Sequence, residues 1–385
     1  MTELLIGVIG AGGRGGLARH AHRPDEGVRV VIGADPDPKV APRFHEAYGP
    51  EAVLVADYRR LLERDDVGAV FVCSPDFLHE EHAAAALEAG KAVYLEKPMA
   101  ITIEGCDRLL RIACEKGLKL YLGHNMRHMW MVRKMKALID AGRIGEVKAG
   151  WCRHFVAYGG DAYFKDWHAE RARSTSLLLQ KGAHDIDVLH WLCGGYAQRV
   201  SGMGGLTLYD RITDRHSPAE RGDASWHLEH WPPLSQTGLN PIIDVEDLSM
   251  MLMRLDNGVF CSYQQCHYTP DGWRNYTIIG TEGRVENLGS VIRLWTRRVD
   301  HNPWGDEHFC PPPVVGGHGG ADPKIVEEFV RYVRTGGKVT TSPVAARYAV
   351  AAGCKAAESI RADGAPQDIP PLPPDILDHF NADLA

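Results

Sequence analysis

The sequence predicts an α/β fold whose first third is a doubly wound parallel sheet. Three observations support this prediction. The apolar stretch Leu4–Ile9 leads into a glycine-rich segment, Gly10–Gly15, and apolar strands then alternate with helices as far as Leu122. The apolar residues Ala92–Leu95 end abruptly in two charges and a proline, Glu96-Lys97-Pro98. An apolar strand of this length is typical of a parallel sheet that is covered on both faces.

Composition limits the classes of protein that the chain can represent. Its 385 residues are enough for two domains with substantial cores. The net charge is −7 and the basic residues form no long run, so we expect no nucleic-acid partner. No apolar stretch approaches the length of a membrane-spanning helix, and the N-terminus does not resemble a signal peptide, so we expect no membrane partner. The nine cysteines include no CxxC pair, and we expect no bound metal and a reducing cytoplasm.

The glycine-rich segment has the spacing G-x-G-x-x-G, formed by Gly10, Gly12 and Gly15, with Gly13 and Arg14 between the last two. In this pattern one glycine permits a tight turn, one lets the backbone approach a pyrophosphate, and one lets the helix pack on the strand. The helix that follows directs its unpaired N–H groups at the phosphates. We therefore expect a dinucleotide to bind this segment.

A second apolar strand, Val28–Ile32, leads to Asp35, which lies 20 positions after Gly15 (35 − 15). An acid at this place binds the 2′-hydroxyl of a ribose and repels a 2′-phosphate. The sequence therefore favours NAD over NADP, although Arg14 could still accept a phosphate.

Polar residues follow two of the predicted strands. Ser74, Pro75 and His79 come after the strand Ala69–Cys73, and Glu96 and Lys97 come after Ala92–Leu95. The carboxyl ends of parallel strands share one edge, which is where ligands bind in open α/β sheets. A lysine held there can act as a general acid or base. Alternatively, Glu96 and Lys97 are a solvated pair and His79 is an ordinary polar residue at a helix start.

The other elements expected in the first third follow the same alternation. Thr102 is a plausible N-cap of its helix. The remaining predicted strands and helices are Val53–Val55, Tyr58–Arg64, Phe77–Ala89, Thr102–Lys116 and Leu118–Leu122.

Three motifs occur together and in order: Gly10-x-Gly12-x-x-Gly15, Cys73-Ser74-Pro75 with His79, and Glu96-Lys97-Pro98. With them the chain resembles the glucose–fructose oxidoreductase / inositol dehydrogenase / rhizopine catabolism family of NAD(P)-dependent oxidoreductases. The resemblance implies a Rossmann domain over residues 1–124. It also implies a C-terminal α/β domain over residues 125–385 with a large, open, mostly antiparallel sheet. Helices near 322–361 are expected to pack back toward the first domain.

The resemblance also implies roles for single residues. Lys97 is expected near the substrate hydroxyl and the nicotinamide, Glu96 is expected to help hold the cofactor, and the Lys97–Pro98 peptide is expected to be cis. Asn125 matches a cofactor contact and Arg127 a substrate contact, unless they only belong to a loop that crosses between domains.

In the second domain, His184 matches a family histidine that suits proton transfer, because the pKa of an imidazole lies near neutrality. A packed core histidine is the alternative. The family aspartate four residues earlier is replaced by Gln180, the three glycines before it are Ser174-Thr175-Ser176, and Lys181 adds a cation. Gln180, Lys181, Trp167 and His318 are expected on the substrate side, although Trp167 is also explained by packing. On a single helix, Gln180, His184, Asp187 and Trp191 would form one stripe.

Further features are expected beyond residue 197. Asp210–Pro241 lacks regular structure and carries several aromatic residues, which suggests a substrate lid or a subunit contact. Asp256-Asn257-Gly258 predicts a hairpin turn, and Trp273-Arg274-Asn275 faces either a substrate or a partner subunit. Asp322-Pro323 and Ser342-Pro343 each predict a helix start.

These observations favour an NAD-dependent dehydrogenase that acts on a sugar, a sugar derivative or a cyclitol, with Lys97 as acid or base. One alternative is a glycoside-cleaving enzyme that oxidises its substrate transiently and recycles the NAD, without net NADH production. A second alternative is a non-enzymatic regulator that senses NAD. The broad open sheet suggests a homodimer or homotetramer.

Overall fold

The computed structural model describes residues 3–220, 222–313 and 316–382, and the chain falls into two units. The described part of unit 1 comprises residues 3–129, 316–347 and 372–382, and that of unit 2 comprises 130–220, 222–313 and 348–371. The boundary expected at 124/125 lies near the first division. The ends of the two expected domains (1–2 and 383–385), and parts of the irregular segments expected around 221 and 314–315, lie outside the described residues.

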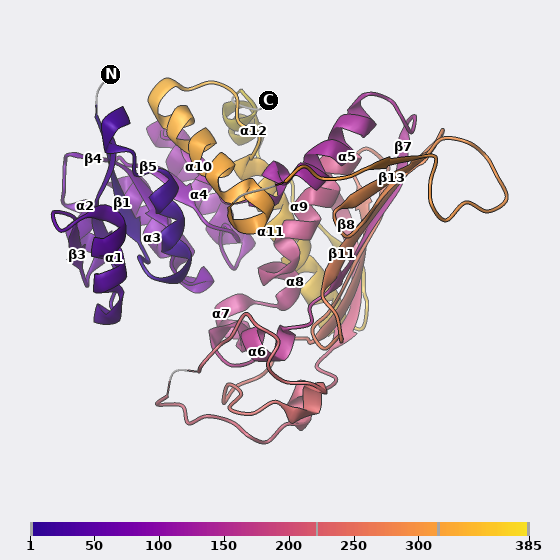
Figure 1. Cartoon of the computed structure of the whole chain (residues 1–385), viewed down its shortest axis with the longest axis horizontal. Coiled ribbons are helices and arrows are strands. Elements are labelled where there is room, and N and C mark those ends of the chain that lie inside the picture. The colour runs from indigo at the N-terminus through magenta and orange to yellow at the C-terminus, as the bar shows by residue number, and fades with distance from the viewer. Residues whose placement is uncertain (1–2, 221, 314–315, 383–385) are drawn as a thin grey trace. The chain divides into compact units, whose positions relative to one another are not determined.

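Unit 1 is built on a parallel sheet with helices packed against it (Figure 1). The strand order is β3-β2-β1-β4-β5-β6, which is that of a doubly wound fold. The order reverses between β1 and β4, and ligands bind at such a switch point. The strands are β1 Leu4–Ile9, β2 Val28–Ala34, β3 Val53–Val55, β4 Val67–Val72, β5 Ala92–Leu95 and β6 Leu120–Leu122.

The helices of unit 1 mostly follow the expected pattern. Thr102 caps α4 by accepting a hydrogen bond from the Gly105 N–H at 3.0 Å, as predicted. The segment after the glycine loop is a 3₁₀ helix, η1, instead of a regular α-helix. The α-helices are α1 Ala41–Tyr48, α2 Tyr58–Leu62, α3 His79–Glu88, α4 Ile103–Lys116, α10 Gly317–Thr335 and α12 Pro374–Asn381. The 3₁₀ helices are η1 Gly13–His20, η2 Pro24–Glu26, η3 Pro38–Val40, η4 Asp76–Leu78 and η5 Asn125–His128.

Helix α10 completes the core of unit 1. Its Phe329 packs with ring centroids 5.2 Å from Phe71, 5.5 Å from Tyr94 and 5.7 Å from Tyr121. These aromatic rings come from three neighbouring strands, β4, β5 and β6. A helix that follows residues 130–313 of unit 2 in the sequence therefore covers one face of the first sheet.

Unit 2 contains a large sheet with the order β14-β13-β12-β11-β7-β10-β9-β8-β15. Its pairs are antiparallel except for β10 and β7, which run parallel. The predicted turn at Asp256-Asn257-Gly258 joins β9 to β10, and Gly258 has the positive φ of 86° that such turns favour. The strands are β7 Val147–Phe155, β8 Ala197–Gly205, β9 Leu248–Leu255, β10 Phe260–Cys266, β11 Trp273–Gly280, β12 Arg284–Leu288, β13 Val291–Trp295, β14 Glu307–Phe309 and β15 Gln367–Asp368.

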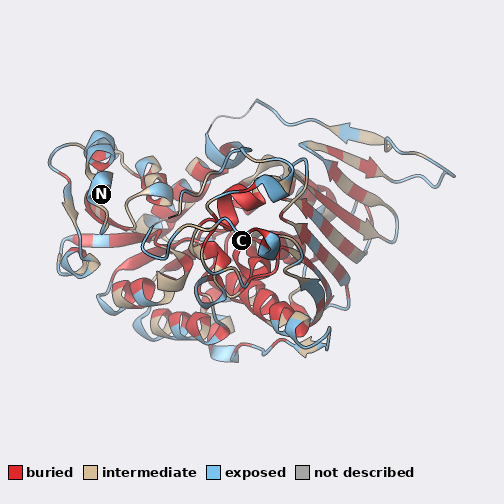
Figure 2. Cartoon of the chain, turned by 90° about the horizontal axis from the view of Figure 1, so that it is seen from below, coloured by how far each residue is buried: buried red, intermediate tan, exposed pale blue. Residues whose placement is uncertain are grey.

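One face of this sheet is covered and the other is open. Figure 2 shows its strands banded in buried and exposed colours, as expected when alternate side chains face a core and solvent. Helix α9 packs on β7, β10 and β11. The helices of unit 2 are α5 Trp130–Asp140, α6 Gly159–Tyr163, α7 Arg171–Ser174, α8 Leu177–Gln180, α9 Gly182–Cys193, η6 Trp167–Ala169, η7 Tyr209–Arg211 and η8 Pro233–Ser235, together with α11, Pro343–Arg361, which begins in unit 1. No helix of the described residues has the length and hydropathy needed to cross a membrane.

Candidate functional site

The glycine loop after β1 has the backbone geometry that its sequence predicts. Gly10 has a positive φ of 78°, and a Cβ atom on it would lie 2.7 Å from the backbone nitrogen of Ser74. A Cβ atom on Gly15 would lie 2.1 Å from the carbonyl oxygen of Gly10. Side chains at either position would therefore clash with backbone, so the tight turn at the switch point requires glycine.

Asp35 lies just beyond β2 and contacts this loop directly. Its carboxylate accepts hydrogen bonds from the Gly12 N–H at 2.9 Å and from the Asp37 N–H at 3.0 Å. The acid predicted to bind a ribose hydroxyl is thus held against the second glycine of the motif, which is where a ribose diol would meet it in this fold.

The end of β5 carries the predicted Glu96 and Lys97. Glu96 is 5% exposed and accepts hydrogen bonds from Arg14 Nε at 2.7 Å, from the Tyr94 hydroxyl at 3.2 Å and from the Lys97 N–H at 3.2 Å. Lys97 is half-buried, and the Lys97–Pro98 peptide is cis, as expected. Glu96 is therefore not a solvated surface charge but a buried carboxylate that an arginine of the glycine loop neutralises.

Arg14 is neutralised by a second acid, Asp322 on α10. Its two terminal nitrogens donate to the Asp322 carboxylate at 2.9 and 3.1 Å, while its Nε donates to Glu96. Burial lowers the pKa of Arg14, but the charges of Glu96 and Asp322 outweigh this and raise it. The guanidinium thus ties the glycine loop to β5 and α10.

Asp322 also gathers two other predicted residues. Its carboxylate accepts from Asn125 Nδ2 at 2.9 Å and lies 2.8 Å from His318 Nδ1. Although burial acts to raise the pKa of Asp322, the bonds from His318 and Arg14 hold it well below its usual range. The regular, right-handed part of α10 begins after a left-handed turn over residues 318–320, close to the helix start expected at Asp322-Pro323, and the Asp322 carboxylate binds Arg14 of the glycine loop. Sequence reasoning missed this role because 308 residues separate Arg14 from Asp322.

His79 is a bridge between two loops at the same sheet edge. Its ring nitrogens lie 2.6 Å from the carbonyl oxygen of Pro98 and 2.8 Å from that of Ser74, and the residue is 1% exposed. The Ser74 hydroxyl is bonded to His82 Nδ1 at 2.9 Å, and Pro75 is half-buried at the start of η4. In this structure His79 holds Ser74 and Pro98 in place and has no free ring nitrogen for a cofactor.

Arg127 was expected on the substrate side. Its guanidinium donates to the carbonyl oxygen of Thr340 at 2.9 Å, and the residue is 5% exposed. The contact joins η5 to the segment that precedes α11.

In unit 2, the single helix expected around His184 is two helices. Helix α8 ends at Gln180, Lys181 forms the joint, and α9 begins at Gly182. The expected stripe of Gln180 with His184 was therefore wrong, because the two residues belong to different helices. Gln180 is 4% exposed and His184 is half-buried.

The residue after His184 is the centre of a buried polar network that sequence reasoning missed. Asp185 is fully buried, and its carboxylate lies 3.1 Å from Arg274 Nε and 3.0 Å from His154 Nδ1. It also accepts from the hydroxyls of Tyr263, at 2.9 Å, and Tyr276.

Strand register explains how these partners meet. Across the neighbouring strands β11, β7 and β10, Arg274 is opposite His154, and His154 is opposite Gln265. Two residues further along each strand, and therefore on the same face of the sheet, a second row is formed by Tyr276, Cys152 and Tyr263. Asp185 lies over both rows, so Arg274 is turned inward to this carboxylate. The sequence does not reveal that Arg274 and His154 bind Asp185, because this contact depends on the register between strands that are distant in the sequence.

Lys181 lies one helical turn before Asp185. Its ammonium donates to the Tyr158 hydroxyl at 3.0 Å and lies 5.4 and 5.3 Å from the ring centroids of Tyr158 and Tyr163. Burial, with the nearby charge of Arg274, lowers the pKa of Lys181 to about 7, although Asp185 opposes this. A buried amine of this kind can bind or exchange a proton near neutral pH.

The described part of the irregular segment 210–241 contacts α6. Trp226 packs edge-on against Tyr163, with ring centroids 5.3 Å apart, and Trp167 stacks on His168 at 3.8 Å. Asp161 of α6 binds His230 Nδ1 at 2.6 Å and Gln236 Nε2 at 2.8 Å. Asp161, Glu229 and His230 form the one described trio with ligand atoms close enough to share a metal ion. These bonds already account for Asp161 as the anchor of the segment.

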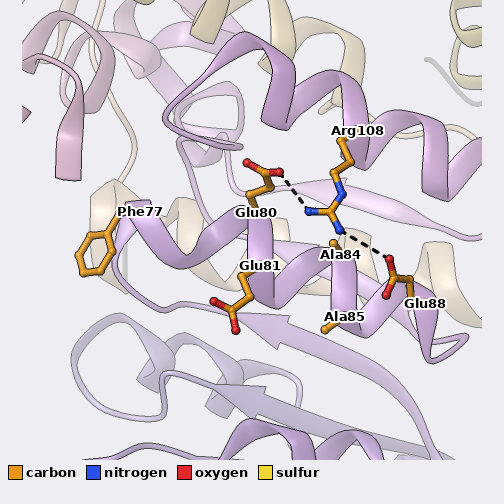
Figure 3. Close-up of a pocket in the computed structure, with 7 residues that line it drawn as sticks. All are labelled: Phe77, Glu80, Glu81, Ala84, Ala85, Glu88 and Arg108. Atoms are coloured by element: carbon orange, nitrogen blue, oxygen red, sulfur yellow. Dashed lines mark hydrogen bonds and ion pairs between the residues drawn. The ribbon is translucent and has the colours of Figure 1, made fainter. Parts of the chain in front are cut away.

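A hollow on the outer side of α3 does not suit a dinucleotide. Figure 3 shows that glutamates line it and that Arg108 of α4 reaches across to two of them. Arg108 lies 3.1 Å from Glu80 and 3.7 Å from Glu88. Such an acidic surface repels phosphates, and its ion pairs join α3 to α4. The lining residues are Phe77, Glu80, Glu81, Ala84, Ala85, Glu88 and Arg108.

The doubly wound sheet, the glycine loop and Asp35 together define a dinucleotide-binding protein of the Rossmann class. Residues 4–124 match the model of the oxidoreductase family with an NAD-binding Rossmann fold, and residues 132–286 match the GFO/IDH/MocA C-terminal domain. The chain therefore belongs to the GFO/IDH/MocA family of oxidoreductases, as the sequence motifs predicted, and its first domain is an NAD-binding domain.

Two relatives are similar in sequence to part of this chain. It is 32% identical over 287 residues to 1-carboxy-3-chloro-3,4-dihydroxycyclohexa-1,5-diene dehydrogenase of Comamonas testosteroni, covering 74% of this chain and 62% of that protein. It is 35% identical over 192 residues to inositol 2-dehydrogenase of Pseudomonas fluorescens, covering 49% of this chain and 54% of that protein. The match thus spans a little more than half the length of these two relatives.

Solved structures share the fold over almost the whole chain. An oxidoreductase domain protein from Kribbella flavida superimposes with a TM-score of 0.78 at 21% identity, over 96% of this chain and 100% of that one. Levoglucosan dehydrogenase in complex with NADH and L-sorbose superimposes with a TM-score of 0.76 at 22% identity, over the same shares. At these identities the likeness concerns the fold.

Proposed function

We propose that this protein is an NAD-dependent dehydrogenase. It transfers hydride between nicotinamide and a hydroxyl-bearing carbon of a sugar, a sugar derivative or a cyclitol. The observation that carries the proposal is the glycine loop with Asp35 bonded to its second glycine, at the same sheet edge as Lys97. The relatives named inositol 2-dehydrogenase and levoglucosan dehydrogenase support this class of substrate.

Lys97 acts as the acid or base in this proposal. Oxidation of an alcohol removes a hydride and a hydroxyl proton, so a proton acceptor must accompany the nicotinamide, which takes the hydride. Lys97 follows a buried strand at the ligand edge, and the neighbouring Glu96 is already neutralised by Arg14. His184 is a second proposed participant in proton transfer, on the strength of its match to the family histidine.

The cofactor preference follows from charge. Asp35 brings a carboxylate to the glycine loop, and Arg14, the cation nearest to that loop in sequence, is held by Glu96 and Asp322. A 2′-phosphate would meet the negative charge of Asp35, so we infer that NAD is preferred over NADP.

The test is NADH formation from NAD across a panel of sugars, cyclitols and glycosides, with Lys97→Met as the variant. We expect at least one sugar or cyclitol to give NADH, and we expect Lys97→Met to lower kcat by about 10²-fold or more without weakening NAD binding. The control is Lys116→Met, which removes an exposed lysine at the end of α4 and keeps wild-type turnover.

Two outcomes contradict this reading. Unchanged turnover in Lys97→Met removes Lys97 from the mechanism. Glycoside cleavage without net NADH production replaces the dehydrogenase with the redox-neutral alternative.

We also propose that the protein forms a homodimer or homotetramer through the open face of the large sheet, and that it works in the cytoplasm. Apolar side chains on that face support the first proposal, among them Leu252 and Phe260, which are 65% and 64% exposed. The cysteines support the second, because Cys193 and Cys261 are free thiols although their sulfurs lie 3.7 Å apart.

A further inference from the structure

The buried cluster around Asp185 has more basic groups than acidic ones. Asp185 is shared by Arg274 and His154 and accepts from two tyrosine hydroxyls as well. Its capacity to accept hydrogen bonds is therefore largely used. Lys181 is a further cation in the same region, and its pKa responds to both Arg274 and Asp185.

Within the described part of the chain, Lys181 forms no ion pair with an acid. The residue is 9% exposed, and among the described residues its ammonium has the Tyr158 hydroxyl as hydrogen-bond partner and the two tyrosine rings as neighbours. A buried charge without a counter-charge is costly, and proteins normally pair it. The residue thus lacks the partner that a structural lysine would have.

His267 is a second group with unused bonding capacity. It is fully buried, and in the described part of the chain neither of its ring nitrogens has a hydrogen-bond partner. Its ring and the Lys181 ammonium both pack against Tyr163, with centroid distances of 5.3 Å in each case. A buried imidazole that lacks partners on both nitrogens is rare in a purely structural position.

We propose that Lys181 and His267 form a binding site for the carboxylate of an acidic substrate, so that the natural substrate is a hydroxylated ring acid, such as a sugar acid or a cyclic hydroxy acid, and not a neutral polyol. This inference rests on the proposed dehydrogenase function and names the substrate class within it. A carboxylate supplies the missing counter-charge to Lys181 and can accept a hydrogen bond from the imidazole of His267.

The surroundings of this site strengthen such a pairing. Trp226 of segment 210–241 packs against the rings of Tyr158 and Tyr163, at 5.9 and 5.3 Å, and so screens the ammonium from water. Ion pairs gain strength when water is excluded. Residues 222–241 then act as a cover for the carboxylate site.

If a carboxylate binds at this site, the protein takes up protons as it binds. The groups that surround Lys181 are Arg274, Asp185, Tyr158, Tyr163, His154 and His267. Burial, with the charge of Arg274, leaves its pKa at about 7, although Asp185 opposes this. A bound carboxylate favours the ammonium and raises this pKa. At pH 8 binding is therefore accompanied by uptake of up to about one proton per ligand, and at pH 6 by almost none.

The experiment compares matched acids and neutral compounds by calorimetry on the full chain with saturating NAD. The pairs are D-glucuronate with D-glucose, and quinate with myo-inositol. We expect one acid to bind about tenfold or more tightly than its neutral partner, because a charged hydrogen bond in a buried site has this magnitude. Lys181→Met abolishes the difference. Lys148→Met, an exposed lysine of β7, is the control that keeps it.

Wild-type protein alone provides the second readout, which does not depend on the variant folding. Titrations at pH 8 in buffers of different ionisation enthalpy report the proton uptake directly. The inference is overturned if neutral and acidic members bind equally, if no proton is taken up at pH 8, or if folded Lys181→Met keeps the preference for acids.

These outcomes separate the inference from the proposed function. NADH formation from neutral polyols with no preference for acids leaves the dehydrogenase standing and removes the carboxylate site. Selective binding of acids without NADH from any compound supports the carboxylate site and removes the dehydrogenase.

Discussion

Single buried residues in unit 2 carry a large electrostatic cost that their neighbours offset. Asp185 is ionised inside the protein because Arg274 and three hydrogen-bonding groups surround it, and although burial acts to raise its pKa these groups hold it well below its usual range. Removing one partner of such a group is far more damaging than replacing the whole set. The network therefore fixes one arrangement of α9 on the sheet.

Two buried histidines near this network make stability depend on pH. Burial, with the charge of Arg274, lowers the pKa of His154 to about 3, and burial holds the pKa of His267 well below its ordinary value. Each histidine is neutral in the folded protein but takes up a proton on unfolding below about pH 6.5. The unfolded state then binds more protons, so stability falls as pH falls from about 6.5 toward the folded pKa.

We predict a slope of up to about 1.4 kcal/mol per pH unit for each such histidine between about pH 6 and pH 4. The measurement is denaturant unfolding in this range, and His267→Gln is expected to reduce the slope by about one proton. The matched control, His45→Gln, removes an exposed imidazole on α1 and keeps the wild-type slope. A wild-type protein with equal stability at pH 7 and pH 5 contradicts the prediction.

Residues whose surroundings are local could be predicted from the sequence. Asp35, Glu96 and Lys97 each follow a strand directly, so their position at the sheet edge follows from the strand itself. Asp185 and Asp322 were not recognised, because the partners that give them their roles come from strands and helices that are distant in sequence.

At the scale of elements, the glycine loop is braced from outside its own βα unit. Arg14 at the start of η1 binds Glu96 after β5 and Asp322 of α10, so three elements converge on one guanidinium. The expectation that Arg14 could accept a cofactor phosphate does not fit a side chain used in this way. The brace fixes the loop that meets the dinucleotide.

A double-mutant cycle tests this brace. Arg14→Gln leaves two buried carboxylates without their cation and is expected to lower the free energy of unfolding by about 2 to 3 kcal/mol. Adding Asp322→Asn restores part of it, with a coupling energy of about 1 to 3 kcal/mol. The measurement is chemical denaturation of the two single variants and the double variant.

The control for the cycle is Arg108→Gln, which breaks exposed ion pairs on α3 and costs less than about 1 kcal/mol. Additive effects of Arg14→Gln and Asp322→Asn would show that the two side chains do not depend on each other.

The sequence predicted the type of each helix or strand better than the point at which one helix ends and the next begins. The strands and helices of unit 1 follow from their apolar patterns, and Thr102 and Gly258 behave as their sequence signals predict. The break between α8 and α9 was not predicted, because residues 177–193 are apolar enough to fit one long helix. A Cβ atom on Gly182 would lie 3.0 Å from the ring of Tyr263, so this glycine serves the close approach of α9 to the sheet, a contact invisible in the pattern.

At the scale of the molecule, the open face of the large sheet is the feature that remains uncovered. Met203, Leu252 and Phe260 are 74%, 65% and 64% exposed there, on three neighbouring strands. An exposed group of apolar side chains is more often a contact surface for another molecule than a surface that stays in water. This pattern is why we propose self-association through this face.

We predict that Leu252→Arg, which places a charge on the middle one of these three strands, shifts the protein from oligomer to monomer without changing its affinity for NAD. Burying an unpaired charge in an interface costs several kcal/mol, enough to lower the association constant by about 10²-fold or more. Light scattering coupled to size-exclusion chromatography measures the mass.

Val299→Arg is the control, since Val299 is 54% exposed but lies outside the strands of the sheet. A wild-type protein that is monomeric at micromolar concentration, or a Leu252→Arg variant with unchanged mass, excludes this face as the interface.

The covering of the first sheet by α10 has a consequence for biosynthesis. Phe329 follows Tyr121 by 208 residues (329 − 121), yet its ring closes the aromatic cluster of β4, β5 and β6. At translation rates of about 5 to 20 residues per second, the ribosome needs about 10 to 40 s to supply that helix. During this interval Phe71, Tyr94 and Tyr121 lack the ring of Phe329 that packs on them in the finished fold, so we expect the first domain to complete its core only after α10 has been made.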